Sequence, residues 1–127
     1  MSTLPLAGVK VLEIAQNLAG PYAGEILARL GADVIKVERP EGGDDARGWG
    51  PPFLKDRAGR DTAESAYFMC ANRGKLSLTL DIARPEGQSI ARELAAVSDV
   101  LLENYKVGDL QRYGLDYDAL CAINPRL

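Results

Sequence analysis

The sequence contains no histidine among its 127 residues. This absence excludes a Ser-His-Asp or Cys-His catalytic arrangement within the chain, and it removes the commonest transition-metal ligand. Only two cysteines are present, Cys70 and Cys121, and two separated cysteines cannot form a structural zinc site alone. We interpret them as free, buried thiols in a reducing compartment. Catalysis would therefore depend on carboxylates, Lys, Tyr or Cys, or on residues beyond Leu127.

A long apolar run is also missing, because no stretch approaches the ~20 residues that cross a bilayer. The first 14 residues lack a basic start, and Glu13 interrupts their apolar stretch, which argues against a signal peptide. The net charge of −3 gives no electrostatic reason to expect nucleic acid or an anionic membrane as the main partner. We therefore expect a cytoplasmic protein that binds neither nucleic acid nor membranes.

What the sequence does contain is an alternation of short apolar runs and amphipathic segments. Residues 9–15 predict a buried strand, and residues 32–37 predict a second one. Between them, Pro21 is suited to the start of a helix that ends at Gly31. The apolar stripe of that helix consists of Tyr22, Ile26, Leu27 and Leu30. Strand, helix and strand within about thirty residues predict a βαβ unit with parallel pairing.

The later segments extend this pattern. Residues 41–62 are rich in Gly, Pro and charge, and we expect a long loop there, anchored by Trp49 and Phe53. We expect strands at 76–80 and 100–102, and helices at 64–71, 85–97, near 110 and at 116–122. The pattern predicts an α/β fold, a Rossmann-like parallel sheet with flanking helices. A parallel sheet must be covered on both faces and closed at its edges. Because helices are few and the C-terminal edge is open, we expect residues 1–127 to be the N-terminal part of a larger, truncated domain. A self-sufficient domain is the alternative.

A ligand of such a sheet binds beyond the carboxyl ends of its strands. Those ends fall at residues 15–20, 38–40, 80–83 and 103–106. The first turn aims backbone amides and a helix N-terminus at the ligand, an arrangement that suits phosphate. The alternative is a tight turn without a binding role.

Two standard phosphate motifs fail. A dinucleotide-binding site needs the motif GxGxxG after the first strand, but only Gly20 and Gly24 are present there. A P-loop needs a further glycine upstream of Gly74, and the sequence lacks it. Glu38 could bind a nicotinamide ribose, whereas Arg39 offers a cationic fork that suits a phosphate. The alternative for both is a solvated strand end.

The other charged residues have simpler interpretations. Arg73 and Lys75 are interpreted as exposed turn residues. Asp44, Asp45 and Arg47 are interpreted as surface charges of the long loop.

A series of short segments, taken together and in order, gives a more specific indication. They are residues 6–13 (LAGVKVLE), 18–22 (LAGPY), 30–38 (LGADVIKVE), 47–52 (RGWGPP), 72–75 (NRGK), 80–81, 85–87, 99–105 (DVLLENY) and 124–127 (NPRL). In these the chain resembles the N-terminal part of class III CoA-transferases. That family includes formyl-CoA:oxalate and carnitine-type transferases and is related to 2-methylacyl-CoA racemases.

The resemblance implies a Rossmann-like large domain, a smaller domain absent from this chain, and an interlocked homodimer. It implies coenzyme A or acyl-CoA as a substrate at the strand ends, with no tightly bound cofactor and no metal. Matched position by position, the CoA contacts are Leu18, Ala19, Arg39, Leu80, Asp81, Ile82, Ala83, Asn104, Tyr105, Lys106 and Arg112. Arg39 would bind the 3′-phosphate of the adenosine end.

The implied activity is the transfer of CoA between an acyl-CoA and a carboxylic acid. The nucleophile of the family is an aspartate that attacks the thioester and forms an acyl-enzyme anhydride. It lies downstream of the matched segments, so we expect no catalytic residue within this chain. The alternatives are a racemase segment, which the long segment 47–62 disfavours, a non-catalytic fragment, and a nicotinamide oxidoreductase, which the broken glycine pattern disfavours.

This sequence departs from the family pattern at two of the implied contacts. Leu18 stands where oxalate-using relatives carry glutamine, which argues against oxalate as the acceptor. Ala83 stands where some relatives carry lysine, so one phosphate contact is expected to be missing.

Overall fold

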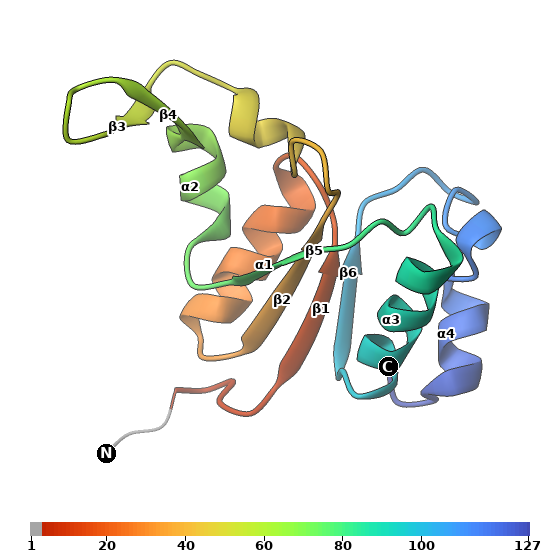
Figure 1. Cartoon of the computed structure of the whole chain (residues 1–127). Coiled ribbons are helices and arrows are strands. Elements are labelled where there is room, and N and C mark those ends of the chain that lie inside the picture. Colours follow the sequence, from red (N-terminus) through yellow and green to blue (C-terminus); the bar gives the residue numbers. More distant parts are fainter. Residues whose placement is uncertain (1–3) are drawn as a thin grey trace.

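The computed structural model describes residues 4–127, and its centre is a four-stranded parallel β-sheet (Figure 1). The strands are β1 (Lys10–Ile14), β2 (Asp33–Glu38), β5 (Leu76–Thr79) and β6 (Val100–Glu103), in the order β5-β2-β1-β6. All three neighbouring pairs are parallel. The predicted α/β fold with a parallel sheet is therefore confirmed, and all four carboxyl ends lie at one edge.

Helices cover both faces of this sheet (Figure 1). On one face lie α1 (Ala19–Arg29) and α2 (Ala66–Asn72), and on the other lie α3 (Pro85–Ala96) and α4 (Tyr117–Ile123). Two short 3₁₀ helices, η1 (Asp45–Gly48) and η2 (Gln111–Tyr113), lie in the connections. Each predicted helix is present, with small shifts of its ends. Helix α1 begins at Ala19, two residues ahead of Pro21, and the Tyr22 amide closes its first turn by donating to Leu18 O.

The side chains of β1 alternate between the two faces, as the pleat of a strand requires. Leu12 and Ile14 pack in the larger core cluster, beneath Ala91 and Ala95 of α3. Val11 belongs to the smaller cluster on the opposite face, together with Val34 of β2. Glu13 has the same parity as Val11, so the face that α1 covers carries a charge next to its apolar core.

The predicted apolar stripe of α1 is only partly its buried face, because Leu27 alone of its four residues packs against the core. Tyr22 is 52% exposed, and Ile26 and Leu30 are also exposed. The buried residues of α1 are Pro21, Gly24 and Glu25, two of which are small enough for a close approach to the sheet. In α3, too, the buried residues are small: Gly87, Ala91 and Ala95, rather than Ile90 or Val97.

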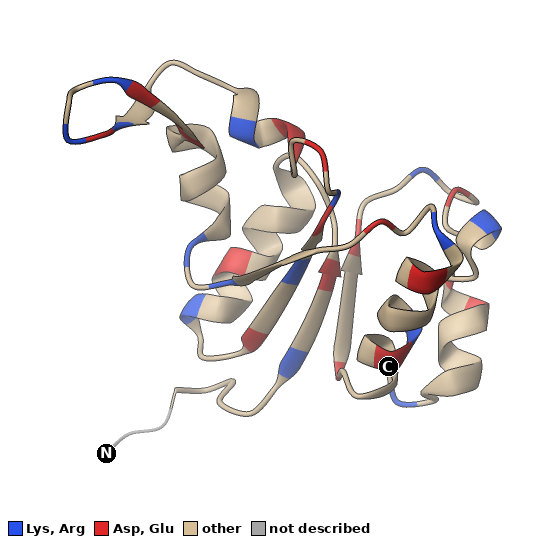
Figure 2. Cartoon of the chain, in the orientation of Figure 1, with Lys and Arg blue, Asp and Glu red and all other residues tan. Residues whose placement is uncertain are grey.

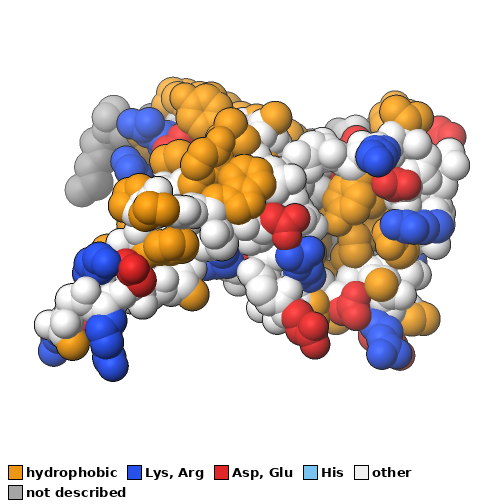
Figure 3. Space-filling model, turned by 90° about the horizontal axis from the view of Figure 1, so that it is seen from above, with side chains coloured by type: hydrophobic (Ala, Val, Ile, Leu, Met, Phe, Trp, Pro, Cys, Tyr) orange, Lys and Arg blue, Asp and Glu red, His pale blue; other side chains and the backbone are white. Residues whose placement is uncertain are grey.

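An exposed apolar surface results on the side of α1 and α2. It consists of Tyr22, Ile26, Trp49, Tyr67 and Met69. Figure 3 shows hydrophobic side chains gathered on this part of the molecule. Trp49 packs edge-on against Tyr67 of α2, with ring centroids 5.1 Å apart, and so anchors the preceding segment as expected.

The prediction of a structureless loop at 41–62 is wrong. The segment contains η1 and most of a hairpin that extends from the body, in which β3 (Phe53–Lys55) pairs antiparallel with β4 (Asp61–Ser65) (Figure 1). At its tip Asp56 Oδ1 accepts hydrogen bonds from the amides of Ala58 and Arg60, at 2.8 and 2.9 Å. Charged residues line both arms of the hairpin (Figure 2). Because β3 has only three residues and β4 is mostly polar, neither strand shows the apolar alternation on which the prediction depended.

Both cysteines are free, but they are not buried as expected, because Cys70 is exposed and Cys121 is partly exposed. Cys70 lies on the outer side of α2, a helix whose buried residues are Phe68 and Ala71. Among residues 4–127, no helix combines the length and the apolar character needed to span a bilayer.

Candidate functional site

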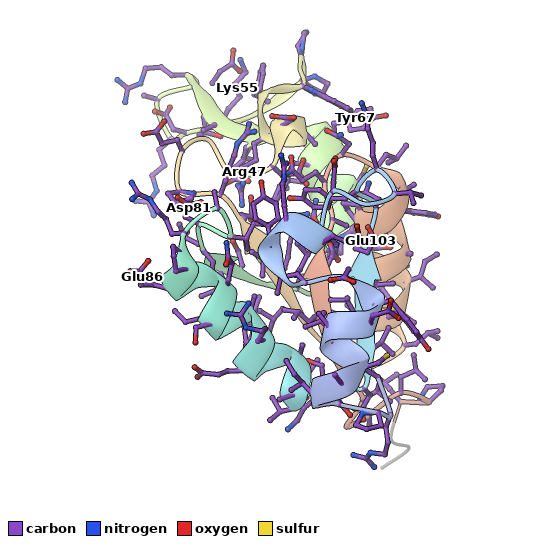
Figure 4. The ribbon with its side chains drawn as sticks, turned by 90° about the vertical axis from the view of Figure 1, so that its right-hand side faces the viewer. Arg47, Lys55, Tyr67, Asp81, Glu86 and Glu103 are labelled. Atoms are coloured by element: carbon purple, nitrogen blue, oxygen red, sulfur yellow. The ribbon has the colours of Figure 1, made fainter. Side chains whose placement is uncertain are left out.

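The candidate site lies where the four strands end. A hollow of about 140 Å³ opens there, lined by Ile14, Ala15, Gln16, Val37, Arg39, Leu80, Asp81, Ile82, Ala83, Tyr105 and Tyr113. A more polar hollow of about 240 Å³ adjoins it, lined by Glu38, Arg39, Pro40, Gly42, Gly43, Arg47, Ser77 and Thr79. Arg39 lines both. Figure 4 shows Arg47, Asp81 and Glu103 toward this same end of the sheet.

The structure brings some of the predicted CoA contacts together and not others. Arg39, Leu80, Asp81, Ile82, Ala83 and Tyr105 line the smaller hollow. The other five do not line it: Leu18, Ala19, Asn104, Lys106 and Arg112. Lys106 borders a separate hollow of about 430 Å³ between β6 and α4.

Asn104 has a defined place next to the smaller hollow. Its side chain accepts a hydrogen bond from the Gln16 amide at 2.9 Å and donates to Gln16 O at 2.7 Å. It therefore ties the end of β6 to the first turn, so its side chain shapes the site rather than lining it.

Besides Ile14 and Val37 within the strands, Tyr113 is a lining residue that sequence reasoning missed. It belongs to η2 and lies 4.7 Å below the guanidinium of the predicted contact Arg112, measured to the ring centroid. With Tyr105 it gives the hollow two aromatic rings. Burial raises the pKa of Tyr105, so its hydroxyl remains a neutral hydrogen-bonding group near pH 7. The only indication in the sequence that Tyr113 belongs to the site was its position directly after the predicted contact Arg112.

Arg39 is placed to meet an anion from solution. Its side chain is 49% exposed, its Nε donates to Glu41 O at 3.0 Å, and its guanidinium pairs with Asp45, which is also exposed. An exposed ion pair contributes about 0–1 kcal/mol, so a phosphate can replace Asp45 at little cost.

Glu38, by contrast, is not available to a ribose. Its carboxylate is buried and accepts hydrogen bonds from Arg47, from the Asp44 amide and from Ser77 Oγ. Burial alone would raise its pKa, but these bonds, led by those of Arg47, outweigh it and lower the pKa to about 2. The ribose-binding interpretation of Glu38 is therefore wrong, because both oxygens are already used within the protein.

The interpretation of Arg47 as a surface charge is also wrong. Its guanidinium lies 3.7 Å from the ring centroid of Phe68 and donates to Glu38 and Glu64. The hydrogen bond to Glu38 raises the pKa of Arg47, so the pair stays charged. Arg47 fixes the segment after β2 against α2 and the end of the strand.

Beneath the first turn lies a buried group of four charged side chains, Glu13, Lys36, Asp44 and Lys75, which we call the charged tetrad. Each side chain is at most 2% exposed. The interpretations of Asp44 as a surface charge and Lys75 as an exposed turn residue are therefore wrong. Glu13 and Lys36 face each other in the register of β1 and β2. Glu13 and Lys36 carry opposite charges within two otherwise apolar strands. This pattern could have indicated a buried ion pair, but sequence reasoning did not use it.

The first turn approaches the sheet closely. A Cβ at Gly20 would lie 2.5 Å from the Cβ of Ala15, and one at Gly24 would lie 2.0 Å from Glu13 Oε2. The glycines that fail as a dinucleotide motif thus seat α1 on β1. Leu18 precedes the helix without a capping side-chain hydrogen bond, and Leu18 and Ala19 are exposed. The site therefore combines a helix N-terminus, a cationic fork and apolar walls, which suits a phosphate-bearing ligand with an apolar body.

Comparison with known proteins decides the family. The family model described as CoA-transferase family III matches residues 6–127. The chain belongs to this family.

Among curated CoA-transferases, the succinate–glutarate CoA-transferase of Agrobacterium fabrum is 51% identical, over 97% of this chain and 30% of that protein. The succinyl-CoA:glutarate CoA-transferase of Homo sapiens is 48% identical, over 97% of this chain and 26% of that protein. A solved CAIB/BAIF family structure from Brucella suis superposes with a TM-score of 0.90 at 53% identity, covering 99% of this chain and 32% of that one. The chain thus spans about a quarter to a third of the length of these relatives, and its fold is that of the matching part of the Brucella suis structure.

Proposed function

We propose that the protein carrying this chain is a CoA-transferase that moves CoA between an acyl-CoA and a carboxylic acid, and that residues 1–127 supply part of its CoA-binding large domain. The family membership supports the reaction class, and the relatives described above are named as transferases, not racemases. Their names pair succinate with glutarate, which favours dicarboxylic acids as substrates. In line with the resemblance, we propose a cytoplasmic homodimer without a tightly bound cofactor.

One observation carries the binding role of this chain, namely the place of Arg39 between the two hollows at the strand ends. A guanidinium there can bind the 3′-phosphate of CoA, while Leu80, Ile82 and Tyr105 offer apolar surface to the adenosine. The exposed amide end of α1 then lies along the path toward the acyl group. The nucleophilic aspartate that the resemblance implies would come from a part of the protein outside this chain.

The test compares CoA with dephospho-CoA, which lacks that phosphate, by calorimetric titration of the protein at the full length of its coding sequence. A charged hydrogen bond of roughly 1.5–3 kcal/mol predicts about ten- to a hundredfold tighter binding of CoA. Arg39→Ala should abolish the difference, and Arg60→Ala, an exposed arginine of the hairpin, should preserve it. Equal binding of the two ligands by the unmodified protein, or tighter binding of NAD, would overturn the assignment.

A further inference from the structure

We propose that the charged tetrad is a positioning unit that holds the first turn, residues 15–21, in the shape that receives CoA. The inference rests on the proposed function for the identity of the ligand, but its structural part can be tested without ligand. It concerns residues that lie behind the turn and would not touch CoA themselves.

Lys36 holds the start of the turn. Its Nζ lies 3.0 Å from Glu13 Oε1, 2.8 Å from Asp44 Oδ2 and 2.7 Å from the backbone oxygen of Ala15. An ammonium group has three N–H donors, and three oxygens surround this one. The last residue of the buried strand segment is thereby fixed by a charged donor.

Lys75 holds the other end. Its Nζ donates to Pro21 O at 2.7 Å and to Asn72 Oδ1 at 2.9 Å, and it lies 2.7 Å from Glu13 Oε2. Burial lowers the pKa of Lys75, and the hydrogen bond and charge of Glu13 offset this lowering only in part. Glu13 thus joins the two lysines, one oxygen to each, and the lysines bind the carbonyl groups on either side of the turn.

Asp44 holds the middle. Its Oδ1 accepts from the Asn17 amide at 3.0 Å and from the Ala46 amide at 2.9 Å, while its Oδ2 faces Lys36. Asn17 has a φ of 67°, a left-handed conformation that costs free energy for a residue other than glycine. The bond from its amide to a buried carboxylate offsets that cost and fixes the direction in which Leu18 and Ala19 leave the turn.

The contacts of the tetrad argue for more than general stability. Two lysines and two carboxylates sum to zero charge, and a buried ionic group of this kind is often no more stabilising than apolar residues of equal volume. Its backbone contacts include one at each end and one in the middle of the turn. Its two carboxylate oxygens without hydrogen-bond geometry, Glu13 Oε2 and Asp44 Oδ2, still contact lysines as ion pairs. The network therefore fixes the geometry of a binding segment.

The experiment uses Asp44→Asn in the full-length protein and measures amide hydrogen exchange of the peptide spanning residues 15–22 without ligand. Asn124→Ala serves as a matched destabilised control, because it removes side-chain bonds to Ala95 O and Ser98 O away from the turn. We expect Asp44→Asn, but not Asn124→Ala, to accelerate exchange in this peptide. We also expect it to weaken CoA binding by about tenfold, because a loosened turn must be ordered when the ligand binds.

Two results would overturn the positioning role. One is that Asp44→Asn accelerates exchange in residues 15–22 no more than Asn124→Ala does. The other is that Asp44→Asn leaves the CoA affinity unchanged. If Asp44→Asn does not fold, Asp44→Glu carries the same test, because it keeps the charge near Lys36 but displaces the acceptor of the Asn17 amide. An unmodified protein that does not bind CoA would refute the proposed function. The exchange measurement would still decide whether the tetrad holds the turn.

Discussion

The Nε atom of Arg47 lies 2.7 Å from Oε2 of Glu38, and the Nη2 atom of the same guanidinium lies 2.9 Å from Oε1. This two-point pair, nine residues apart in sequence, joins the segment after β2 to the end of that strand. Both residues line the polar hollow, together with Arg39. The geometry of a bidentate pair is specific as well as strong, so it places the segment that carries Asp44 and Asp45.

The Glu38 pair predicts acid sensitivity in a defined range. The pKa of Glu38 falls from 4.5 to about 2 on folding, so its stabilisation is complete above pH 4.5 and is lost as the pH falls toward 2. The shift corresponds to roughly 3 kcal/mol of unfolding free energy. Urea denaturation between pH 2 and 7 should show this slope, and Glu38→Gln should remove most of it. Glu86→Gln, an exposed carboxylate of α3, should retain it, and an unchanged slope in Glu38→Gln would contradict the assignment.

Gly24→Ala should destabilise the protein because α1 packs directly on Glu13. The added Cβ would lie 2.0 Å from Glu13 Oε2, so the helix or the tetrad must move, at about 1–3 kcal/mol of unfolding free energy. Gly48→Ala is the matched control, since no atom lies within 4 Å of its added Cβ. Thermal denaturation of both variants gives the comparison. Equal melting temperatures would mean that α1 does not sit as closely as described.

Tyr113→Ala should weaken CoA binding by about three- to tenfold, the range of an aromatic contact of 0.5–1.5 kcal/mol. The reason is its place on the wall of the smaller hollow, which Tyr105 also lines. Titration of CoA against Tyr117→Ala supplies the control, because Tyr117 is 75% exposed and lies on α4 outside that hollow. An effect of equal size in the two variants would remove Tyr113 from the site.

Ala83→Lys should strengthen CoA binding by about three- to tenfold. Ala83 is exposed on the rim of the smaller hollow, and a lysine there would supply the phosphate contact that the family resemblance indicates is missing. The expected gain in affinity is smaller than a full charged hydrogen bond would give, because ordering the flexible lysine side chain costs entropy. Ala96→Lys, exposed at the end of α3, adds the same charge elsewhere. If both substitutions help equally, the effect is only general electrostatic attraction.

The parts of the fold that could be predicted are those dictated by apolar runs. The strands β1 and β2 lie within a residue of their predicted bounds because a buried parallel strand needs consecutive apolar residues. The hairpin β3–β4 could not be predicted in this way. Its strands are short, β4 is mostly polar, and its stability depends on specific contacts such as the hydrogen bond from Thr62 Oγ1 to Leu54 O at 2.8 Å.

For the site, binding of a ligand at the strand ends stays a prediction, whereas the expectation that Asp44, Arg47 and Lys75 are exposed is wrong. The strand ends indicated where a ligand would bind, and Arg39 lies there. Asp44, Arg47 and Lys75 were assigned to solvent because charged residues in loops are usually exposed. Each has a partner far away in sequence, such as Glu13 for Lys75, and only the folded arrangement brings these partners together.

Strand β1 is hydrogen bonded along both edges, to β2 on one side and β6 on the other. A strand in that place separates from its neighbours only when the sheet itself opens, so its amides should be among the slowest to exchange. The first turn starts from the end of this strand. Coenzyme A would therefore bind to a segment that lost its conformational entropy during folding. Ordering this segment would then subtract little from the free energy of binding.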